Sequence, residues 1–263
     1  MSVMARPDPH VVIVGGGFAG LWATRALASA KLRITLVDRG NHHLFQPLLY
    51  QVATAGLSAP DIAAPLRHIL RKQKNVEVRM AAVTGIDAAA KRIALDDGGS
   101  LDFDFLLLAS GATHAYFGND HWARHAPGLK TLDDALDLRR KLLLAFERAE
   151  AASDPAERAA WLSFAIVGGG PTGVELAGTL AAIARHTLQD EFRNIDPAQA
   201  KVRLLEAGPR VLASFPEDLS AKAKRQLEKL GVEVALGTPV QDINADGYML
   251  GDAFVPAKTV VWA

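Results

Sequence analysis

Cysteine is absent from the 263 residues of this chain. The protein can therefore form no disulfide, no thiolate metal site and no redox-active pair of thiols. If it transfers electrons, a bound cofactor has to carry them. The sequence thus excludes thiol chemistry before any motif is considered.

An excess of charge of one sign is also missing. The chain holds 29 lysine and arginine residues against 29 aspartate and glutamate residues, so its formal net charge is zero. A balanced chain has no strong electrostatic attraction to polyanions, and we therefore expect no nucleic-acid partner.

Long hydrophobic runs are the third absence. The N-terminal stretch MSVMARPDPH has no apolar core of the kind that a signal peptide needs. Elsewhere, glycine and charged residues interrupt the apolar stretches well before the ~20 residues that span a bilayer. We expect no part of these 263 residues to cross a membrane, and the length is sufficient for two domains with separate cores.

The stretch IVGGG occurs twice, at residues 13–17 and 166–170. Each copy follows a strand rich in valine and isoleucine, begins an apolar helix, and completes the pattern G-x-G-x-x-G. The pattern glycines are Gly15, Gly17 and Gly20 in the first copy and Gly168, Gly170 and Gly173 in the second. In a dinucleotide-binding turn the first glycine permits the tight bend, the second lets a pyrophosphate approach, and the third lets helix and strand pack closely.

Each copy is followed by a strand that ends in an acidic residue. Asp38 lies close to the spacing expected of a carboxylate that accepts the two ribose hydroxyls of a dinucleotide. Glu206 follows the second turn at a longer spacing, because ARHTLQDEFRNIDPAQA extends the connection. A carboxylate there would repel a 2′-phosphate and favours NADH over NADPH, although Arg210 nearby weakens this inference.

Glycine turns in α/β sheets need not bind anything, and for one copy alone this interpretation stays open. Two copies, each with an acidic strand end, favour two dinucleotides in one chain. Because no cysteine is present, the natural pair is a flavin and a nicotinamide.

These patterns predict an α/β fold with two Rossmann-like, FAD/NAD(P)-binding domains, parallel sheets and a small antiparallel β-meander insert. We place the first domain at residues 1–117, a linker at 118–130, and the second domain with its preceding helix at 131–258. Residues 259–263 are predicted to form an apolar strand.

Several local elements are also predicted. A Ser58-x-x-Asp61 capping signature predicts a helix. Its apolar face would hold Ile62, Leu66, Ile69 and Leu70. Residues 75–108 are predicted to form short antiparallel strands, with a hairpin turn at 97–99.

Two more helices and one histidine pair follow. Thr131 is predicted to cap a helix, and Gly231 to end another. Their apolar stripes would be Leu138, Leu142, Ala145 and Ala149 in the first, and Leu219, Ala223, Leu227 and Leu230 in the second. His121 and His125 have the spacing of a helical metal pair but no third ligand, so we predict no metal site.

Five stretches together resemble the type II NADH dehydrogenases, single-subunit flavoproteins of the class with two dinucleotide-binding domains. They are IVGGGFAGLWATRAL, NHHLFQPLLYQVATAGLS, FLLLASGATHAYFG, GGGPTGVELAG and EAGPRVL. The resemblance runs from about His10 to Ala263. The glycine motifs identify only the superfamily, whereas HHLFQPLLYQVAT and GGGPTGVELAG are more specific to this family.

The resemblance implies FAD-dependent NADH:quinone oxidoreduction, with FAD in the first domain and NADH in the second. The residues implied in FAD binding are Gly15, Gly17, Phe18, Ala19, Gly20, Asp38, Arg39, Ala109, Ser110 and Gly111. Those implied in NADH binding are Gly168, Gly170, Pro171, Thr172, Gly173 and Glu206.

Glu175, Gln46 and Gln51 are implied in catalysis by the same resemblance. A glutamate at the position of Glu175 lies near the stacked nicotinamide and flavin in the family, and the FQPLLYQ loop, with Gln46, Pro47 and Gln51, lies beside the isoalloxazine. From the residues alone, Glu175 has a simpler explanation, because a carboxylate in the first turn of a helix complements the helix dipole. Both roles stay open.

The resemblance also implies partners and a location. NADH and a quinone are the expected small-molecule substrates, and the full-length family is cytoplasmic and peripheral to the inner face of the membrane. A homodimer is compatible with it. The resemblance implies that residues 259–263 begin a return to the first, flavin-binding domain. In the family, the C-terminal part that follows supplies the remaining quinone site and the membrane-facing helices, and we expect that part to be missing here.

Two alternative functions remain. One is a flavin-dependent NAD(P)H reductase of a soluble electron carrier, and the other is a nucleotide-binding fragment without catalysis. Sulfide:quinone and disulfide reductases are disfavoured because their chemistry needs cysteines.

Overall fold

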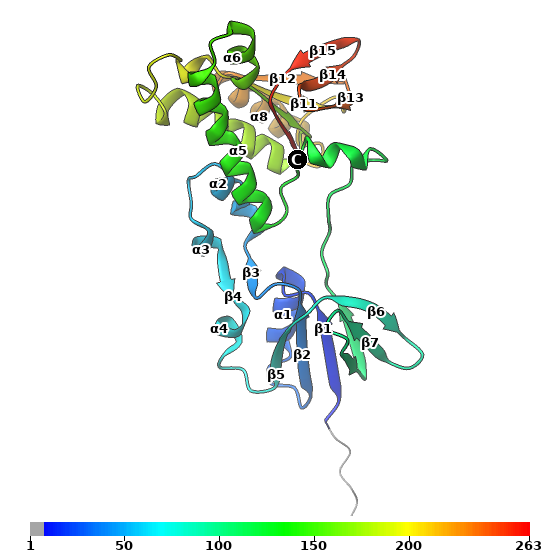
Figure 1. The fold of residues 1–263 in the computed structure, drawn as a ribbon. Coiled ribbons are helices and arrows are strands. Elements are labelled where there is room, and N and C mark those ends of the chain that lie inside the picture. The colour runs from blue at the N-terminus through cyan, green and yellow to red at the C-terminus, as the bar shows by residue number, and fades with distance from the viewer. Residues whose placement is uncertain (1–7) are drawn as a thin grey trace, which may run out of the picture. The chain divides into compact units, whose positions relative to one another are not determined.

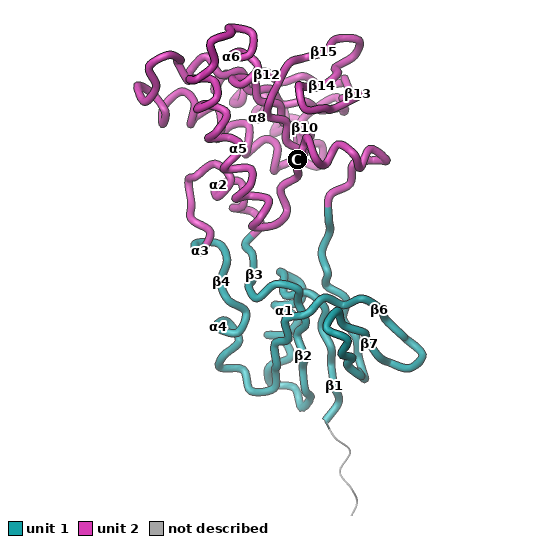
Figure 2. The backbone as a smooth tube through the Cα atoms, in the orientation of Figure 1, with its two compact units in different colours: residues 1–45, 60–113 teal, residues 46–59, 114–263 magenta. Residues whose placement is uncertain are grey.

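The structure is a computed structural model that describes residues 8–263 (Figure 1). The chain divides into two compact units, shown in different colours in Figure 2. Unit 1 contains the chain up to Phe45 together with Pro60–Thr113. Unit 2 contains Gln46–Ala59 and His114–Ala263. The segment 46–59 therefore belongs to unit 2, although unit 1 precedes and follows it in the sequence.

A parallel sheet of four strands forms the centre of unit 1, in the order β5-β2-β1-β9. Its strands are β1 (His10–Val14), β2 (Arg33–Asp38), β5 (Val76–Met80) and β9 (Phe105–Leu108). Alternate residues of β1 face opposite sides, as the period of a strand requires. Val11 and Ile13 pack with α1 (Phe18–Ala26) and α4 (Leu66–Leu70), and Val12 packs with the antiparallel strands on the other side.

Those antiparallel strands form the predicted β-meander. They are β6 (Val83–Asp87), β7 (Arg92–Leu95) and β8 (Ser100–Asp102). The turn between β7 and β8 lies at 97–99 as predicted, and Gly98 takes the φ of +79° that this bend requires. The prediction was wrong in direction for residues 76–80 and 105–108, because β5 pairs in parallel with β2 and β9 pairs in parallel with β1.

The helix predicted after Ser58 is interrupted. The structure has α3 (Ala59–Ile62), then strand β4 (Ala63–Pro65), then α4, and β4 pairs antiparallel with β3 (His42–Leu44). Pro65 explains the break, since proline lacks the N–H of a helix interior and disfavours the helical conformation at the residue before it. Ile62, Leu66 and Leu70 are nevertheless buried.

Unit 2 repeats the design around a second parallel sheet, in the order β12-β11-β10-β16. Its strands are β10 (Ser163–Val167), β11 (Lys201–Glu206), β12 (Val232–Leu236) and β16 (Thr259–Trp262). Helices α7 (Pro171–Ala182) and α8 (Glu217–Lys229) pack against these strands. The other face is covered by antiparallel strands β13 (Val240–Ile243), β14 (Gly247–Leu250) and β15 (Ala253–Pro256).

Helices and short turns complete unit 2. They are η1 (Gln46–Leu48), α2 (Leu49–Ala53), η2 (Asp120–Arg124), α5 (Leu132–Ala151), α6 (Pro155–Trp161), η3 (Ile183–Thr187) and η4 (Pro197–Gln199). Thr131 caps α5 as predicted, in a reciprocal capping box with Asp134. The predicted stripe of α5 is buried throughout, whereas in α8 Leu227 is buried and Leu219 and Leu230 are exposed.

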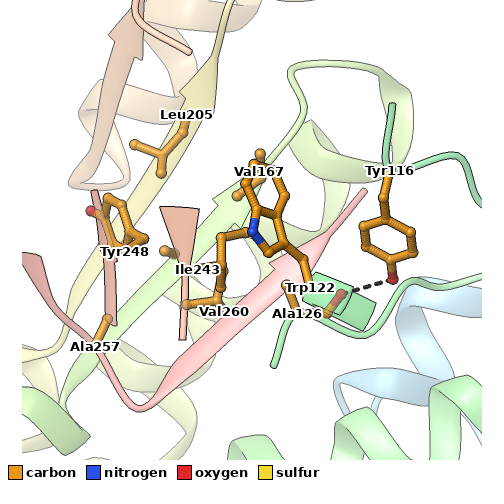
Figure 3. Packing of buried hydrophobic residues seen from close by; sticks show 10 residues of the cluster. Tyr116, Trp122, Ala126, Val167, Leu205, Ile243, Tyr248, Ala257 and Val260 are labelled. Carbon is orange, nitrogen blue, oxygen red and sulfur yellow. Dashed lines mark hydrogen bonds between the residues drawn. The ribbon is translucent and has the colours of Figure 1, made fainter. Parts of the chain in front are cut away.

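One buried cluster joins residues 116–126 to the last strands of the chain. Its members include Trp122, Val260 of β16 and Tyr248 of β14, and the Tyr116 hydroxyl donates a hydrogen bond to the carbonyl of Ala126 at 2.9 Å (Figure 3). The α/β fold class is confirmed.

Two predicted segments differ from the structure. Residues 118–130, predicted as a linker, contain η2 and the buried Trp122 and Ala126, so this segment is part of the core of unit 2. Residues 259–263, predicted to begin a return to the first domain, form β16, which pairs in parallel with β10. The buried run of β-branched residues in β16 suits a strand with cover on both faces.

Candidate functional site

The two glycine turns have the same backbone. Gly15 has φ +105° and Gly168 has φ +116°, a region that side-chain-bearing residues rarely adopt. A Cβ on Gly20 would lie 1.8 Å from the Gly15 carbonyl oxygen, and one on Gly173 would lie 1.9 Å from that of Gly168. The first and third glycines of each copy are therefore required by the fold itself.

The middle glycine of each copy has no such role. A Cβ built on Gly17 or Gly170 would meet no described atom within 4 Å. Since the fold leaves this space open in both copies, the glycines there keep the backbone accessible from outside. That is the position at which a dinucleotide pyrophosphate approaches a turn of this kind.

The helix that follows each turn begins with unpaired backbone donors. In the described chain, α1 and α7 have no side-chain cap at Gly17 or Gly170 and no acidic residue in the first turn. Their first N–H groups and their positive dipole ends are available to an anion. Phe18 and Ala19 begin α1, while Pro171 and Thr172 begin α7, so the second copy lacks one N–H because Pro171 has none.

Both acidic strand ends hold their own turn together. The Asp38 carboxylate accepts hydrogen bonds from the backbone N–H of Gly16 at 2.5 Å and of Gly40 at 2.6 Å. The Glu206 carboxylate accepts from Gly169 and Gly208, both at 2.6 Å. Each carboxylate oxygen receives one hydrogen bond and retains a free lone pair, which a ribose hydroxyl could use.

We call each pair of backbone-to-carboxylate hydrogen bonds a carboxylate clasp. The clasps were not predicted from the sequence, which assigned Asp38 and Glu206 to ribose binding alone. A signal was present, because a glycine stands two residues after each acid and between the first two pattern glycines. Arg39, predicted in the same site, lies exposed between Asp38 and Gly40.

A short segment closes over each turn from the neighbouring strand. Ala109 follows β9, donates its N–H to the Val14 carbonyl at 2.8 Å, and has its carbonyl oxygen 2.2 Å from a Cβ built on Gly15. Ser110 and Gly111 continue from it, and Gly111 has φ +73°. The structure thus brings this predicted segment to the first turn.

Ala263 holds the same place in the second copy. It follows β16, donates its N–H to the Val167 carbonyl at 2.8 Å, and its carbonyl oxygen lies 2.5 Å from a Cβ built on Gly168. The sequence did not indicate Ala263. The available signal was the shared pattern of an apolar strand followed by alanine, FLLLA and TVVWA.

The residues implied in catalysis lie in unit 2. Gln46 donates through Nε2 to the Lys130 carbonyl at 2.9 Å, and Gln51 donates to the Tyr50 hydroxyl at 3.0 Å. Helix α2, which carries Gln51, packs against α5 and against α7, which carries Glu175. Gln51 and Glu175 therefore come from neighbouring helices, while the first glycine turn belongs to unit 1.

Glu175 is the fifth residue of α7, beyond the first turn. The prediction that it complements the helix dipole from the first turn was wrong, because α7 begins at Pro171. Its side chain is exposed, yet partial desolvation by its neighbours raises the pKa of the Glu175 carboxyl. Among the described residues, no hydrogen bond or ion pair reaches this carboxylate.

The described residues provide neither a metal site nor a membrane-spanning helix. Residues 8–263 contain no group of three histidine, cysteine, aspartate or glutamate side chains that could hold a metal ion. His121 packs edge-on against Trp122. None of the helices described in the structure has the length and apolar character needed to span a bilayer.

Known proteins resemble this chain in sequence and in fold. The pyridine nucleotide-disulphide oxidoreductase profile matches residues 9–263. The Mycobacterium tuberculosis type II NADH:quinone oxidoreductase Ndh is 49% identical over 251 residues, covering 94% of this chain and 54% of Ndh. NdhA from the same organism is 46% identical, covering 97% and 56%. The chain thus spans about half the length of these relatives, and the predicted resemblance is confirmed.

A solved structure gives the same picture for the fold. NDH2 from Plasmodium falciparum in complex with NADH superposes with a TM-score of 0.89 at 23% identity, over 97% of this chain and 55% of that one.

Proposed function

The chain belongs to the pyridine nucleotide-disulphide oxidoreductase family, and from this premise we propose that it carries the FAD and NADH sites of a type II NADH:quinone oxidoreductase. One observation carries the proposal: the strained first glycine, the open middle glycine and the carboxylate clasp recur in both turns. Two turns of identical geometry provide for two adenine dinucleotides in one chain.

In unit 1, the N-terminal N–H groups of α1 would hold the pyrophosphate of FAD at Gly17, and Asp38 would accept a ribose hydroxyl. Ala109, Ser110 and Gly111 would close the turn from the side of β9. The residues fit the group, because the open space at Gly17 and the uncapped helix offer what a phosphate needs. A bound flavin would supply the redox chemistry, as an acceptor for the hydride of NADH and a two-electron donor to a quinone.

In unit 2, α7 and Gly170 would hold the pyrophosphate of NADH and Glu206 its ribose. A preference for NADH over NADPH follows from the Glu206 carboxylate, which would repel a 2′-phosphate. The Arg210 guanidinium is not free to attract a 2′-phosphate, because it donates hydrogen bonds to the carbonyls of Phe215 and Ala213 at 2.7 and 2.8 Å.

Glu175 is the residue we assign to the nicotinamide side of the reaction. A carboxylate near this ring would stabilise positive charge that develops as the hydride leaves. We expect Glu175→Gln to lower kcat about tenfold, less than the roughly 10²–10³-fold cost of losing an oxyanion-hole donor, because the Glu175 side chain is exposed and its charge is screened. Stopped-flow flavin reduction by NADH measures this step, and unchanged turnover with unchanged NADH affinity would remove Glu175 from the mechanism.

The deciding experiment is the visible spectrum of the purified 263-residue chain. We expect a flavin spectrum that bleaches when NADH is added without air, followed by reoxidation with a soluble quinone. Reoxidation only by a ferredoxin-type protein would assign the chain to the carrier reductases instead. A colourless protein that takes up no FAD would support the alternative that the chain is a nucleotide-binding fragment without catalysis.

From the family resemblance we also propose peripheral attachment of the full-length family members to the cytoplasmic face of a membrane, and a homodimer as the assembly. Flotation with vesicles and sedimentation velocity test the two points separately.

A further inference from the structure

A basic cavity in unit 2 stands apart from the glycine turn. It has a volume of about 350 Å³ and lies between α5, η2, the end of α6 and the beginning of β16. Its basic lining residues are Arg124, His125, Lys141, Arg148 and Lys258, and no aspartate or glutamate lines it. In a chain whose acidic and basic residues balance, this is a local excess of positive charge.

The charges in this cavity are mostly uncompensated. Lys258 forms an ion pair with Asp246 at 2.6 Å. For Arg124, Lys141 and Arg148, the described residues provide no ion pair or side-chain hydrogen bond. The charge of Arg148, in the last turn of α5, interacts favourably with the negative end of the helix dipole. That explanation does not extend to Lys141 in the middle of α5 or to Arg124 in η2.

The rest of the wall is mostly apolar, and Asn244 and Thr259 are its polar members. Lys141, Leu144 and Arg148 are spaced to lie on one face of α5, so a leucine separates the two cations along the helix. Trp161, half-buried at the end of α6, adds an aromatic surface. The cavity therefore offers several cationic donors beside an apolar wall, within the size range of ligand sites.

The cavity is at the other end of the sheet from the cofactor turn. Thr259 and Val260, at the amino end of β16, line the cavity. Ala263, at the carboxyl end, lies against Gly168. A dinucleotide whose pyrophosphate rests on the Gly170 turn therefore does not supply the anion for this cavity.

We propose that this cavity binds a phosphate-bearing anion, with the phosphate oxygens held by Arg124, Lys141 and Arg148 and an apolar part against Trp161 and Leu144. Arginine matches phosphate with paired N–H donors, and lysine adds a point charge. Such a ligand removes the mutual repulsion of cations that lack protein partners. The phosphate could belong to a soluble compound or to a phospholipid headgroup, since the chemistry of recognition is shared.

The test is a calorimetric titration of inorganic pyrophosphate into the 263-residue chain with NADH at saturation, which occupies the glycine turn. We expect Lys141→Gln with Arg148→Gln to weaken binding by about tenfold or more, as the loss of charge-assisted hydrogen bonds predicts. The matched control is Arg139→Gln with Arg140→Gln, which removes the same charge from α5 outside the cavity wall. The control is expected to stay within about twofold of the parent, because neither side chain lines the cavity and salt screens their charges.

Vesicles distinguish the two sources of phosphate. Co-sedimentation with phosphatidylglycerol vesicles, compared with phosphatidylcholine vesicles, assigns the ligand to a lipid if the cavity variant loses it and the control variant keeps it. Pyrophosphate binding without vesicle binding assigns it to a soluble compound. No binding of either probe by the parent chain, or equal losses in the cavity and control variants, overturns the proposal. Circular dichroism melts of both variants show that each is folded.

Discussion

Strands β9 and β16 hold the same place in two sheets of one design, yet one is exposed and the other is buried. Each pairs in parallel with the strand that leads into a glycine turn, β1 or β10. Phe105 and Leu108 of β9 are 63% and 59% exposed, whereas Val261 of β16 is 1% exposed. The difference lies in the elements that pack on each strand. Helix α5 and strand β14 contact β16, whereas the β-meander of unit 1 packs mainly on Val12 of β1 and Val37 of β2.

The glycine turns are the same despite this difference in cover. Their φ angles, closed first and third positions, open middle position and carboxylate clasps agree between the units. The turn is therefore specified by residues within a few positions of it and by the next strand, whereas the stability of each sheet depends on elements far away in the sequence. Substitutions can separate these two properties.

The largest effect is expected where a side chain has no room. Gly173→Val in unit 2 and Gly20→Val in unit 1 each place a Cβ within 2 Å of a carbonyl oxygen. We expect a loss of about 3 kcal/mol in the free energy of unfolding, the upper range for overpacking. Hydrogen exchange, followed by mass spectrometry, should show the loss mainly in the unit that carries the change.

The control for these variants uses the open position. Gly170→Ala and Gly17→Ala add the same Cβ where no described atom lies within 4 Å. They should leave the exchange pattern unchanged and weaken only nucleotide binding. Loss of protection in the alanine variants would show that the middle glycine is also required by the fold.

A smaller effect separates the two edge strands directly. Val261→Ala removes two methyl groups from a fully buried site and should cost about 2 kcal/mol, from lost transfer energy and the cavity left behind. Leu108→Ala removes a largely exposed side chain and should change stability by less than about 0.5 kcal/mol. Urea unfolding of the two variants measures the contrast, and equal losses would mean that β9 is covered in solution.

Neutralising the carboxylate of either clasp should destabilise its unit by a similar amount. Asp38→Asn and Glu206→Gln keep the shape but replace charged acceptors of two backbone N–H groups each. We expect each to lose roughly 1–2 kcal/mol, since hydrogen bonds to charged groups are worth more than neutral ones. Thermal melts measure this, and a loss in only one unit would show that the two clasps are not equivalent.

The local character of the turns explains what the sequence could predict. Gly15, Gly20 and Asp38, with their counterparts in the second copy, follow from spacing alone. The clasp to Gly16, the role of Ala263 and the place of residues 46–59 in unit 2 depend on which strands pair and which helices pack. Parallel pairing of β5 and β16 joins residues distant in sequence, and no local pattern distinguishes it from an antiparallel or returning strand.

The smallest expected effect concerns the cover of unit 2. Tyr248 is fully buried beneath the antiparallel strands, and its hydroxyl has no hydrogen-bond partner in the described structure. Burial raises the pKa of the Tyr248 hydroxyl, and the nearby positive charge of Arg203 lowers it by a smaller amount. The geometry between the two side chains does not meet that of a hydrogen bond. A buried, unpaired hydroxyl costs free energy, so Tyr248→Phe should leave stability unchanged or raise it by up to about 1 kcal/mol. Urea unfolding of the parent chain and of Tyr248→Phe measures the difference in their free energies of unfolding. A loss above that size would mean that the hydroxyl has a partner in solution, and that the cover of β16 includes a polar contact as well as apolar packing.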